Sequence, residues 1–275
     1  MSKHFYDQIR NYNIAPKKSL GQNFLTDQNI VNKIISTVPN IKQKHILEVG
    51  PGVACLSLPI LQKKPKKFSC IEFDERCIKF WKEQIMPQFE GIELFHDNAL
   101  TFDESKLITK GEKLTLIANL PYNIASVLLI KWLGKIHLFD ELVLMFQKEV
   151  AERICASANT KKYGILSVLS QYLCDCRIAF NIAPTCFYPP PKIESSIVII
   201  KPKHDALDRL ALFPELKSLV KTLFNMRRKT ILNNLKTLSN NTIDILQKAN
   251  IDKSLRPENL SIEEFITLVR IMKKS

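Results

Sequence analysis

The chain has 275 residues, of which 45% are hydrophobic, so it can form one large or two smaller domains with a substantial core. Its formal net charge of +13 favours a polyanionic partner such as nucleic acid, although charge can also serve solubility alone. A membrane-spanning protein is disfavoured because no apolar run reaches roughly 18 residues, and a secreted protein is disfavoured because residues 1–10 lack an apolar signal segment. A zinc protein is disfavoured because the seven scattered cysteines lack paired ligand spacing. Such cysteines are typical of reduced thiols in a cytoplasmic protein.

The first 22 residues are basic and poor in apolar side chains. One interpretation is an arm that closes over a ligand, with Lys17 and Lys18 facing phosphate. The alternative is a disordered basic leader. Gln22 and Asn23 lie directly before the apolar pair Phe24-Leu25, and this placement favours the arm.

A strand, a glycine turn and a helix follow, at 44–49, Gly50-Pro51-Gly52 and 56–62. This order is typical of the first unit of a nucleotide-binding α/β sheet. The next strand, 67–71, ends at Glu72, where a carboxylate can bind both hydroxyls of a ribose. NAD or another adenosine cofactor is possible. Because the turn has no run of glycines that would admit a pyrophosphate, a cofactor without phosphate fits better, and we predict S-adenosylmethionine.

Polar side chains also follow the next two predicted strands. Strand 92–95 leads to Asp97 and Asn98, where a polar group can bond the adenine amino group. Strand 114–118 leads to the stretch Asn119-Leu120-Pro121-Tyr122. With helices between them, these strands are expected to form a parallel sheet, whose carboxyl ends are where ligands bind.

The 119–122 stretch has the groups needed to hold an exocyclic amine such as adenine N6. The side-chain oxygen of Asn119 and the backbone carbonyl of Leu120 can each accept one N6 hydrogen, which favours a more nucleophilic nitrogen. Pro121 stiffens the loop without adding a donor. Tyr122 can stack on the base, a contact worth about 1–3 kcal/mol. The alternative interpretation is a β-turn with a buried tyrosine.

Three more strands are predicted, at 142–146, 176–182 and 193–200, with helices at 125–133, 148–156 and 164–173. Before the last strand, three prolines at 189–191 force an extended segment. Such a segment can hold Phe187 against the second face of the stacked base. Alternatively, Phe187 belongs to the core.

From about residue 204 only helical patterns remain. We therefore predict a catalytic α/β domain over 1–203 and a small helical, RNA-binding domain over 204–275. The basic cluster Arg227-Arg228-Lys229, placed on a helix, is interpreted as a ridge that contacts RNA phosphates. The alternative is an ordinary solvated helix face.

Taken in order, these pieces resemble the KsgA/RsmA-type rRNA adenine dimethyltransferases over nearly the whole chain. The matching stretches are KSLGQNFL, EVGPG, IEFD, NLPYN, QKEVAERI, YGILSVLSQY, FYPPPKIESS, RRKTILNNL and RPENLSIEEF.

The resemblance implies a Rossmann-like methyltransferase sheet of seven strands followed by a small helical domain. It also implies transfer of methyl groups from S-adenosylmethionine to N6 of two adjacent adenosines in the 3′-terminal hairpin of small-subunit rRNA. The expected partner is an immature small ribosomal subunit, and we expect a cytoplasmic monomer without a metal. Carried over by position, the expected site residues are Asn23, Leu25, Gly50, Glu72, Asn98 and Asn119 for the cofactor, Asn119, Leu120, Pro121, Tyr122 and Phe187 for catalysis, and Lys17, Lys18, Lys192, Arg227, Arg228 and Lys229 for RNA.

Two positions depart from the family pattern. Ala54 stands where glycine is usual, and Asn98 stands where aspartate is usual, with Asp97 one place earlier. We assign the adenine contact to Asn98, because Ala99-Leu100 stay in register with the family.

Two other functions are compatible with parts of the sequence. A large-subunit rRNA methyltransferase of the antibiotic-resistance type shares the cofactor turn and the NLPY loop, but the RRKT and PPPK stretches favour the small-subunit enzyme. A non-catalytic assembly or transcription factor on the same scaffold would have lost more of its cofactor residues.

Overall fold

The computed structural model describes residues 12, 14, 16 and 21–274. The chain divides into two compact units, and each is described by itself. The first unit takes in the chain up to Lys131 together with His137–Ala151 and Arg177–Lys201. The second takes in Trp132–Ile136, Glu152–Cys176 and the chain from Pro202 onward.

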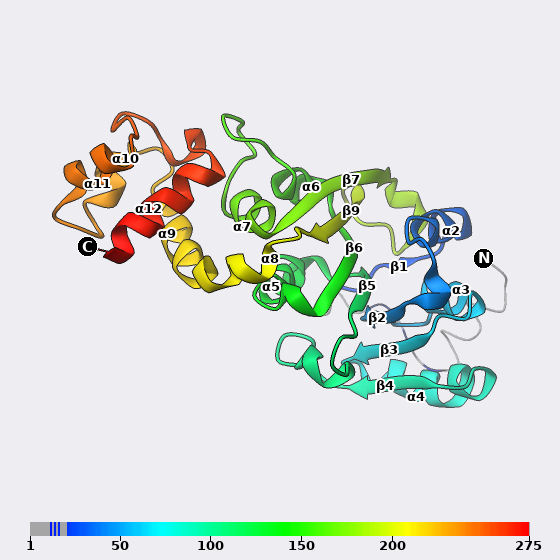
Figure 1. The fold of residues 1–275 in the computed structure, drawn as a ribbon. Coiled ribbons are helices and arrows are strands. Elements are labelled where there is room, and N and C mark those ends of the chain that lie inside the picture. The colour runs from blue at the N-terminus through cyan, green and yellow to red at the C-terminus, as the bar shows by residue number, and fades with distance from the viewer. Residues whose placement is uncertain (1–11, 13, 15, 17–20, 275) are drawn as a thin grey trace. The chain divides into compact units, whose positions relative to one another are not determined.

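A seven-stranded sheet in the order β4-β3-β2-β5-β6-β9-β7 organises the fold (Figure 1). In chain order its strands are β2 (His45–Val49), β3 (Lys67–Glu72), β4 (Ile92–His96), β5 (Leu114–Asn119), β6 (Phe139–Gln147), β7 (Cys174–Ile182) and β9 (Ser195–Pro202). The five strands from β4 to β6 are parallel, and β9 runs antiparallel to β6. The predicted seven-stranded α/β fold is confirmed.

The central strands are apolar because helices cover the parallel sheet and both faces of each strand are buried. Every residue of β2 is buried, and so is every residue of β5 except Asn119 at its end. The helices that follow these strands are α3 (Ser57–Gln62), α4 (Glu75–Phe80), α5 (Tyr122–Leu133) and α6 (Lys148–Ile154). All seven cysteines are free thiols.

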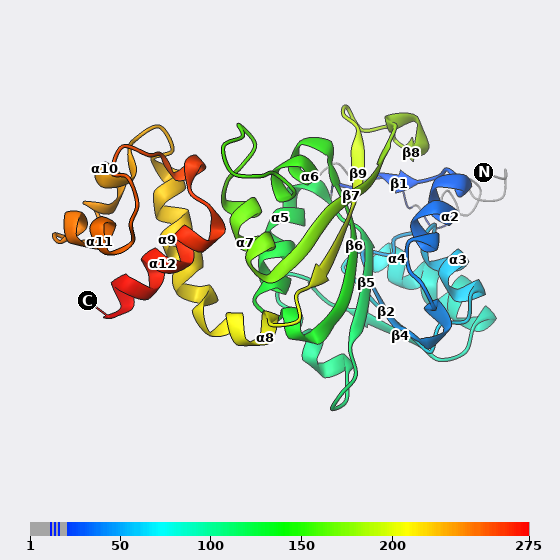
Figure 2. The same ribbon diagram turned by 45° about the horizontal axis from the view of Figure 1, so that its top comes forward.

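The end of the N-terminal arm is fixed by a second, two-stranded sheet. Strand β1 (Phe24–Leu25) pairs antiparallel with β8 (Phe187–Tyr188), and the two lie side by side in Figure 2. Helix α2 (Gln28–Ser36) follows, with the Asp27 side chain as its N-cap. The pairing fixes Phe24 and Leu25, which directly follow Gln22 and Asn23, whereas Lys17 and Lys18 lie outside the described residues.

The second unit is largely helical. Its helices include α7 (Ile165–Leu173), α8 (Ala206–Arg209), α9 (Phe213–Asn225), α10 (Ile231–Leu235), α11 (Thr242–Lys248) and α12 (Ile262–Lys274). Helix α9 buries apolar residues at helical spacing, namely Leu216, Leu219, Val220 and Leu223. Residues 204–275, predicted as a separate domain, lie in this unit, which also takes in α7 because α7 packs on α9. Within the described chain, no helix is long and apolar enough to cross a membrane.

Candidate active site

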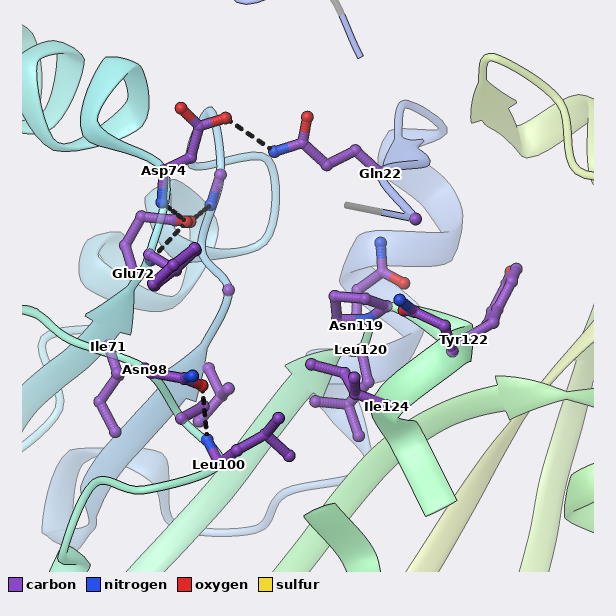
Figure 3. Close-up of a pocket in the computed structure, with 18 of the residues that line it drawn as sticks. Gln22, Ile71, Glu72, Asp74, Asn98, Leu100, Asn119, Leu120, Tyr122 and Ile124 are labelled. Carbon is purple, nitrogen blue, oxygen red and sulfur yellow. Dashed lines mark hydrogen bonds between the residues drawn. The ribbon is translucent and has the colours of Figure 1, made fainter. Parts of the chain in front are cut away.

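A cavity of about 240 Å³ opens at the carboxyl ends of the four parallel strands β4, β3, β2 and β5. Its lining comes from the loop after each strand and from residues 21–24 of the arm (Figure 3). The strand order reverses between β2 and β5, and such a switch point is where open α/β sheets bind ligands.

Most of the predicted cofactor and catalytic residues line this cavity: Asn23, Gly50, Glu72, Asn98, Asn119, Leu120, Pro121 and Tyr122. Figure 3 shows Glu72 and Asn98 on one side and Asn119 and Tyr122 on the other. Leu25 and Phe187 are not among the lining residues. They pair with each other in the β1–β8 sheet and are only 1% and 4% exposed. Phe187 thus lies in the core, as in the alternative interpretation of the sequence.

The Glu72 carboxylate forms part of the cavity wall and is held by backbone donors. Its Oε1 accepts the N–H groups of Phe73 and Asp74, each at 2.8 Å, and its Oε2 accepts the N–H of Gly52 at 3.0 Å. Burial raises the pKa of Glu72, and these three N–H donors oppose that rise. The carboxylate is therefore fixed in orientation beside the cavity, with about one acceptor position, on Oε2, left for a hydroxyl group.

The glycine turn is held from two sides. Besides its bond to Glu72, Gly52 accepts a hydrogen bond from the Trp81 indole N–H at 2.9 Å. Gly50 and Gly52 have φ values of +71° and +53°, a region that favours glycine. A Cβ on Gly50 would meet no atom within 4 Å, so open space lies beside the turn. The turn therefore presents bare backbone to the cavity.

Ala54 adopts a left-handed conformation with φ of +62° and is fully buried. A side chain in this region is strained by about 1–2 kcal/mol. The position therefore suits the glycine that the family pattern has there. Ala54 does not line the cavity, so its methyl group does not reduce the space for a ligand.

Asp97 and Asn98 both line the cavity, and their hydrogen bonds differ. Asn98 Oδ1 accepts the N–H of Leu100 at 2.9 Å, and Asp97 Oδ1 accepts the N–H of Asn98 at 2.6 Å. Asn98 is half-buried, whereas Asp97 is exposed. Asn98 therefore has the more enclosed position of the two. It can offer a base the second lone pair of its Oδ1 and its amide nitrogen.

The Asn119 amide has a fixed orientation. Its Nδ2 donates to the backbone carbonyl of Asn23 at 2.9 Å, across 96 residues of sequence. This bond commits the amide nitrogen to the arm and leaves Oδ1 as the acceptor. Because both residues line the cavity, the oxygen can serve a ligand there.

The Tyr122 ring is tethered by its hydroxyl, which hydrogen-bonds Ser195 Oγ at 2.5 Å. Tyr122 is the first residue of α5 and is half-buried, whereas Ser195 is fully buried at the start of β9. Burial raises the pKa of Tyr122, so its hydroxyl stays neutral at physiological pH.

The arm also bonds to the opposite side of the site. Gln22 Nε2 donates to Asp74 Oδ2 at 3.1 Å (Figure 3). Burial alone would raise the pKa of Asp74, but the bonds from Arg76 and Gln22 lower it overall. Sequence reasoning did not assign a role to Asp74 or Ser195. Asp74 lies in the IEFD stretch and Ser195 in the FYPPPKIESS stretch, but the contact between Ser195 and Tyr122 depends on the fold.

A second carboxyl group, that of Glu48, lies on β2 two residues before the turn at Gly50. It is 2% exposed, and its Oε2 has no hydrogen-bond partner among the described residues. Burial raises the pKa of Glu48 to about 8, and the negative charge of Glu72 adds to the rise. Glu48 is therefore largely protonated at neutral pH.

The predicted basic cluster lies in a turn between α9 and α10, which we call the basic turn (Met226–Lys229), and not on a helix. Helix α9 ends at Asn225, where Met226 leaves the helical conformation, and the Thr230 side chain caps the start of α10. Arg227 pairs with Glu258 and donates to the Lys161 carbonyl. Arg228 and Lys229 are exposed, and no acidic side chain pairs with them in the described structure.

A buried asparagine holds the basic turn in shape. Asn234 Nδ2 lies within 3.3 Å of the carbonyls of Met226, Lys229 and Thr230 and donates to them.

The remaining predicted RNA-binding residue among the described ones, Lys192, belongs to the first unit. It is exposed and lies three residues before β9.

Comparison with known proteins gives consistent results. The model of the family "Ribosomal RNA adenine dimethylase" matches residues 14–274. A "Ribosomal RNA small subunit methyltransferase A" from Wolbachia sp. subsp. Drosophila simulans (strain wRi) is 41% identical over 262 residues, which is 94% of each chain.

Two solved structures share the fold. A dimethyladenosine transferase from Plasmodium falciparum has a TM-score of 0.78 and 27% identity, over 91% of this chain and 98% of that one. The 23S rRNA methyltransferase ErmE has a TM-score of 0.66 and 20% identity, over 91% and 99%. The sheet is thus that of a methyltransferase. Because the family model matches almost the entire described chain, this protein belongs to the ribosomal RNA adenine dimethylase family.

Proposed function

We propose that this family member transfers methyl groups from S-adenosylmethionine to N6 of two adjacent adenosines near the 3′ end of small-subunit rRNA, dimethylating both during assembly of the subunit. The observation that carries the proposal is the orientation of Asn119, whose Nδ2 is bound by the arm so that Oδ1 is left for an amine in the cavity. An oriented acceptor at this place suits the hydrogens of adenine N6.

The residues on the Glu72 side of the cavity fit the cofactor. The Glu72 carboxylate is fixed and buried in the wall, where Oε2 can accept a ribose hydroxyl. The turn at Gly50 has open space beside it and can be approached closely. Asn98 can bond the adenine amino group of the cofactor. When bound, S-adenosylmethionine supplies a methyl group on a cationic sulfur, which is an electrophile for the amine.

The residues on the Asn119 side hold the target base. Asn119 Oδ1 and the Leu120 carbonyl each accept one N6 hydrogen, Pro121 keeps this loop rigid, and Tyr122 stacks on the ring. The nitrogen becomes acidic once it gains a methyl group, and it can lose its proton to water. The site therefore has no need of a general base, and positioning supplies most of the acceleration, for which about 7–11 kcal/mol is attainable.

Exposed basic side chains account for RNA binding. Arg228 and Lys229 of the basic turn are free of acidic partners in the described structure, and Lys192 is exposed in the first unit. They can contact phosphates, whereas the charge of Arg227 is already paired. Lys17 and Lys18 complete the proposed set from the sequence.

The nearest alternative is a large-subunit rRNA methyltransferase. The 41% identity to a small-subunit methyltransferase over 94% of the chain favours our proposal, whereas the 20% identity to ErmE supports the fold alone. The experiment incubates the protein with methyl-labelled S-adenosylmethionine and under-methylated small or large ribosomal subunits in parallel. We expect label in small-subunit rRNA only. Label only in the large subunit would support the alternative, and no label in either, despite cofactor binding, would support a non-catalytic assembly factor.

A further inference from the structure

The hydroxyl of Tyr122 has a partner to which no role in the reaction has been given. Tyr122 Oη and Ser195 Oγ are 2.5 Å apart and link α5 to β9 across 73 residues of sequence. Of the two side chains, only Tyr122 lines the cavity. Ser195 is fully buried, so it can act on a ligand only through the tyrosine.

Ser195 is a rigid anchor. It is the first residue of β9 and pairs with Gln147, the last residue of β6, so strand pairing fixes its backbone. The backbone of Tyr122 is fixed as well, because it starts α5 directly after Pro121. The remaining freedom of Tyr122 is rotation about its side-chain bonds, and the bond to Ser195 removes it.

We propose that Ser195 is a positioning residue, whose hydroxyl fixes the Tyr122 ring in the orientation that receives the target adenine. The inference rests on the proposed function and deepens it. A half-buried ring that is already held loses little rotational freedom when a base stacks on it, so more of the stacking energy is available for binding and alignment. The phenol is engaged by Ser195, which leaves the face of the ring as the part that serves the base.

The neighbouring serine provides a matched control. Ser196 is also fully buried in β9, but its hydroxyl donates to Asn181 Oδ1 at 2.8 Å. Because successive side chains of a strand point to opposite faces of the sheet, Ser196 points away from Tyr122. Ser195→Ala and Ser196→Ala thus each remove one buried hydrogen bond of a serine hydroxyl. Only the bond lost in Ser195→Ala holds the Tyr122 ring.

The experiment is a double-mutant cycle with Ser195→Ala, Tyr122→Phe and the combined variant, each as the full chain. We measure kcat and KM for methyl transfer to under-methylated small ribosomal subunits and, separately, the Kd for S-adenosylmethionine. Each single variant should lose about tenfold in kcat/KM, as expected for one buried hydrogen bond. The combined variant should lose no more than either one, because both changes remove the same bond. The Kd for the cofactor and the activity of Ser196→Ala should match the wild type.

Wild-type kcat/KM in Ser195→Ala, or a combined loss equal to the product of the two single losses, would overturn the inference. If Ser195→Ala does not fold, Tyr122→Phe tests the same bond from its other end, and unchanged kcat/KM there would overturn it equally. Failure of the proposed function has a different signature, since the wild-type protein would then methylate no small-subunit rRNA at all, and the inference would fail with it.

Discussion

At the scale of single residues, the proposed chemistry depends most on the amide of Asn119. Its nitrogen donates to the Asn23 carbonyl, which leaves the oxygen of this cavity-lining residue as the acceptor. Asn119→Ala removes the oriented acceptor, and by analogy with other positioned hydrogen-bonding groups it should lower kcat on the order of 10²–10³-fold. RNA affinity should stay close to wild type, because phosphate contacts supply most of it. Single-turnover transfer and RNA-binding titrations measure the two effects, and equal losses in both would argue against a catalytic role.

A second residue-scale prediction concerns Glu48. Its pKa is raised to about 8 from an ordinary 4.5, so the folded state holds this proton more tightly than the unfolded state. The resulting stability is fully present below pH 4.5 and is lost as the pH rises toward 8. The glutamine of Glu48→Gln cannot ionise. As the pH rises from 4.5 toward 8, the free energy of unfolding of this variant should therefore increase relative to that of the wild type by roughly 1 kcal/mol per pH unit.

Urea unfolding of both proteins at several pH values measures this difference. The exposed Glu90→Gln makes the same chemical change at the surface and serves as the control. A difference between wild type and Glu48→Gln that does not vary with pH would show that Glu48 is not a buried neutral acid.

At the scale of elements, the loop after β4 is held by one lysine. Lys131 Nζ donates to the carbonyls of Ala99 and Phe102 and to Glu104 Oε1, at 2.7, 2.5 and 2.5 Å. Glu104 is fully buried. Lys131→Met should cost about 3–5 kcal/mol of stability, the usual result of breaking a buried ion pair. It should also weaken S-adenosylmethionine binding, because the released loop carries Asn98 and Leu100 of the cavity wall.

Lys66→Met is the matched control, since its ion pair with Glu112 is largely exposed and should be worth at most about 1 kcal/mol. Thermal unfolding gives the stabilities, and calorimetric titration gives the cofactor Kd. Unchanged cofactor affinity in folded Lys131→Met would show that the lysine does not shape the cavity.

The basic turn carries the second element-scale prediction. Arg228→Ala with Lys229→Ala should weaken rRNA binding and reduce the slope of log affinity against log salt by about 0.7–0.9 for each phosphate that the variant no longer neutralises. Arg227→Ala should affect stability more than the salt slope, because its charge is paired with Glu258. Binding at several salt concentrations separates the two, and an identical slope in the double variant and wild type would exclude phosphate binding at this turn.

At the scale of the whole molecule, the sequence predicted the central strands β2, β3 and β5 well because each is a short, mostly apolar run followed by a turn or polar loop. It also predicted the cavity-lining residues after β2, β3, β4 and β5, because carboxyl ends of parallel strands meet at one edge. The sequence did not predict contacts between side chains that are far apart in the chain. Nothing in the local pattern indicates that Ser195 bonds Tyr122 or that Asn23 orients Asn119. Phe187 was ambiguous for the same reason, since its pairing with Leu25 depends on the path of the arm.

The central claim is that one cavity aligns the amino nitrogen of an adenine in small-subunit rRNA for repeated methylation. The most direct measurement is mass spectrometry of rRNA nucleosides after incubation of the protein with S-adenosylmethionine and under-methylated small subunits. We predict N6,N6-dimethyladenosine at two adjacent positions near the 3′ end of that rRNA, and formation of it on the order of 10²–10³-fold more slowly with Asn119→Ala. Methylated adenosine confined to large-subunit rRNA, or none at all from protein that binds the cofactor, would contradict the claim.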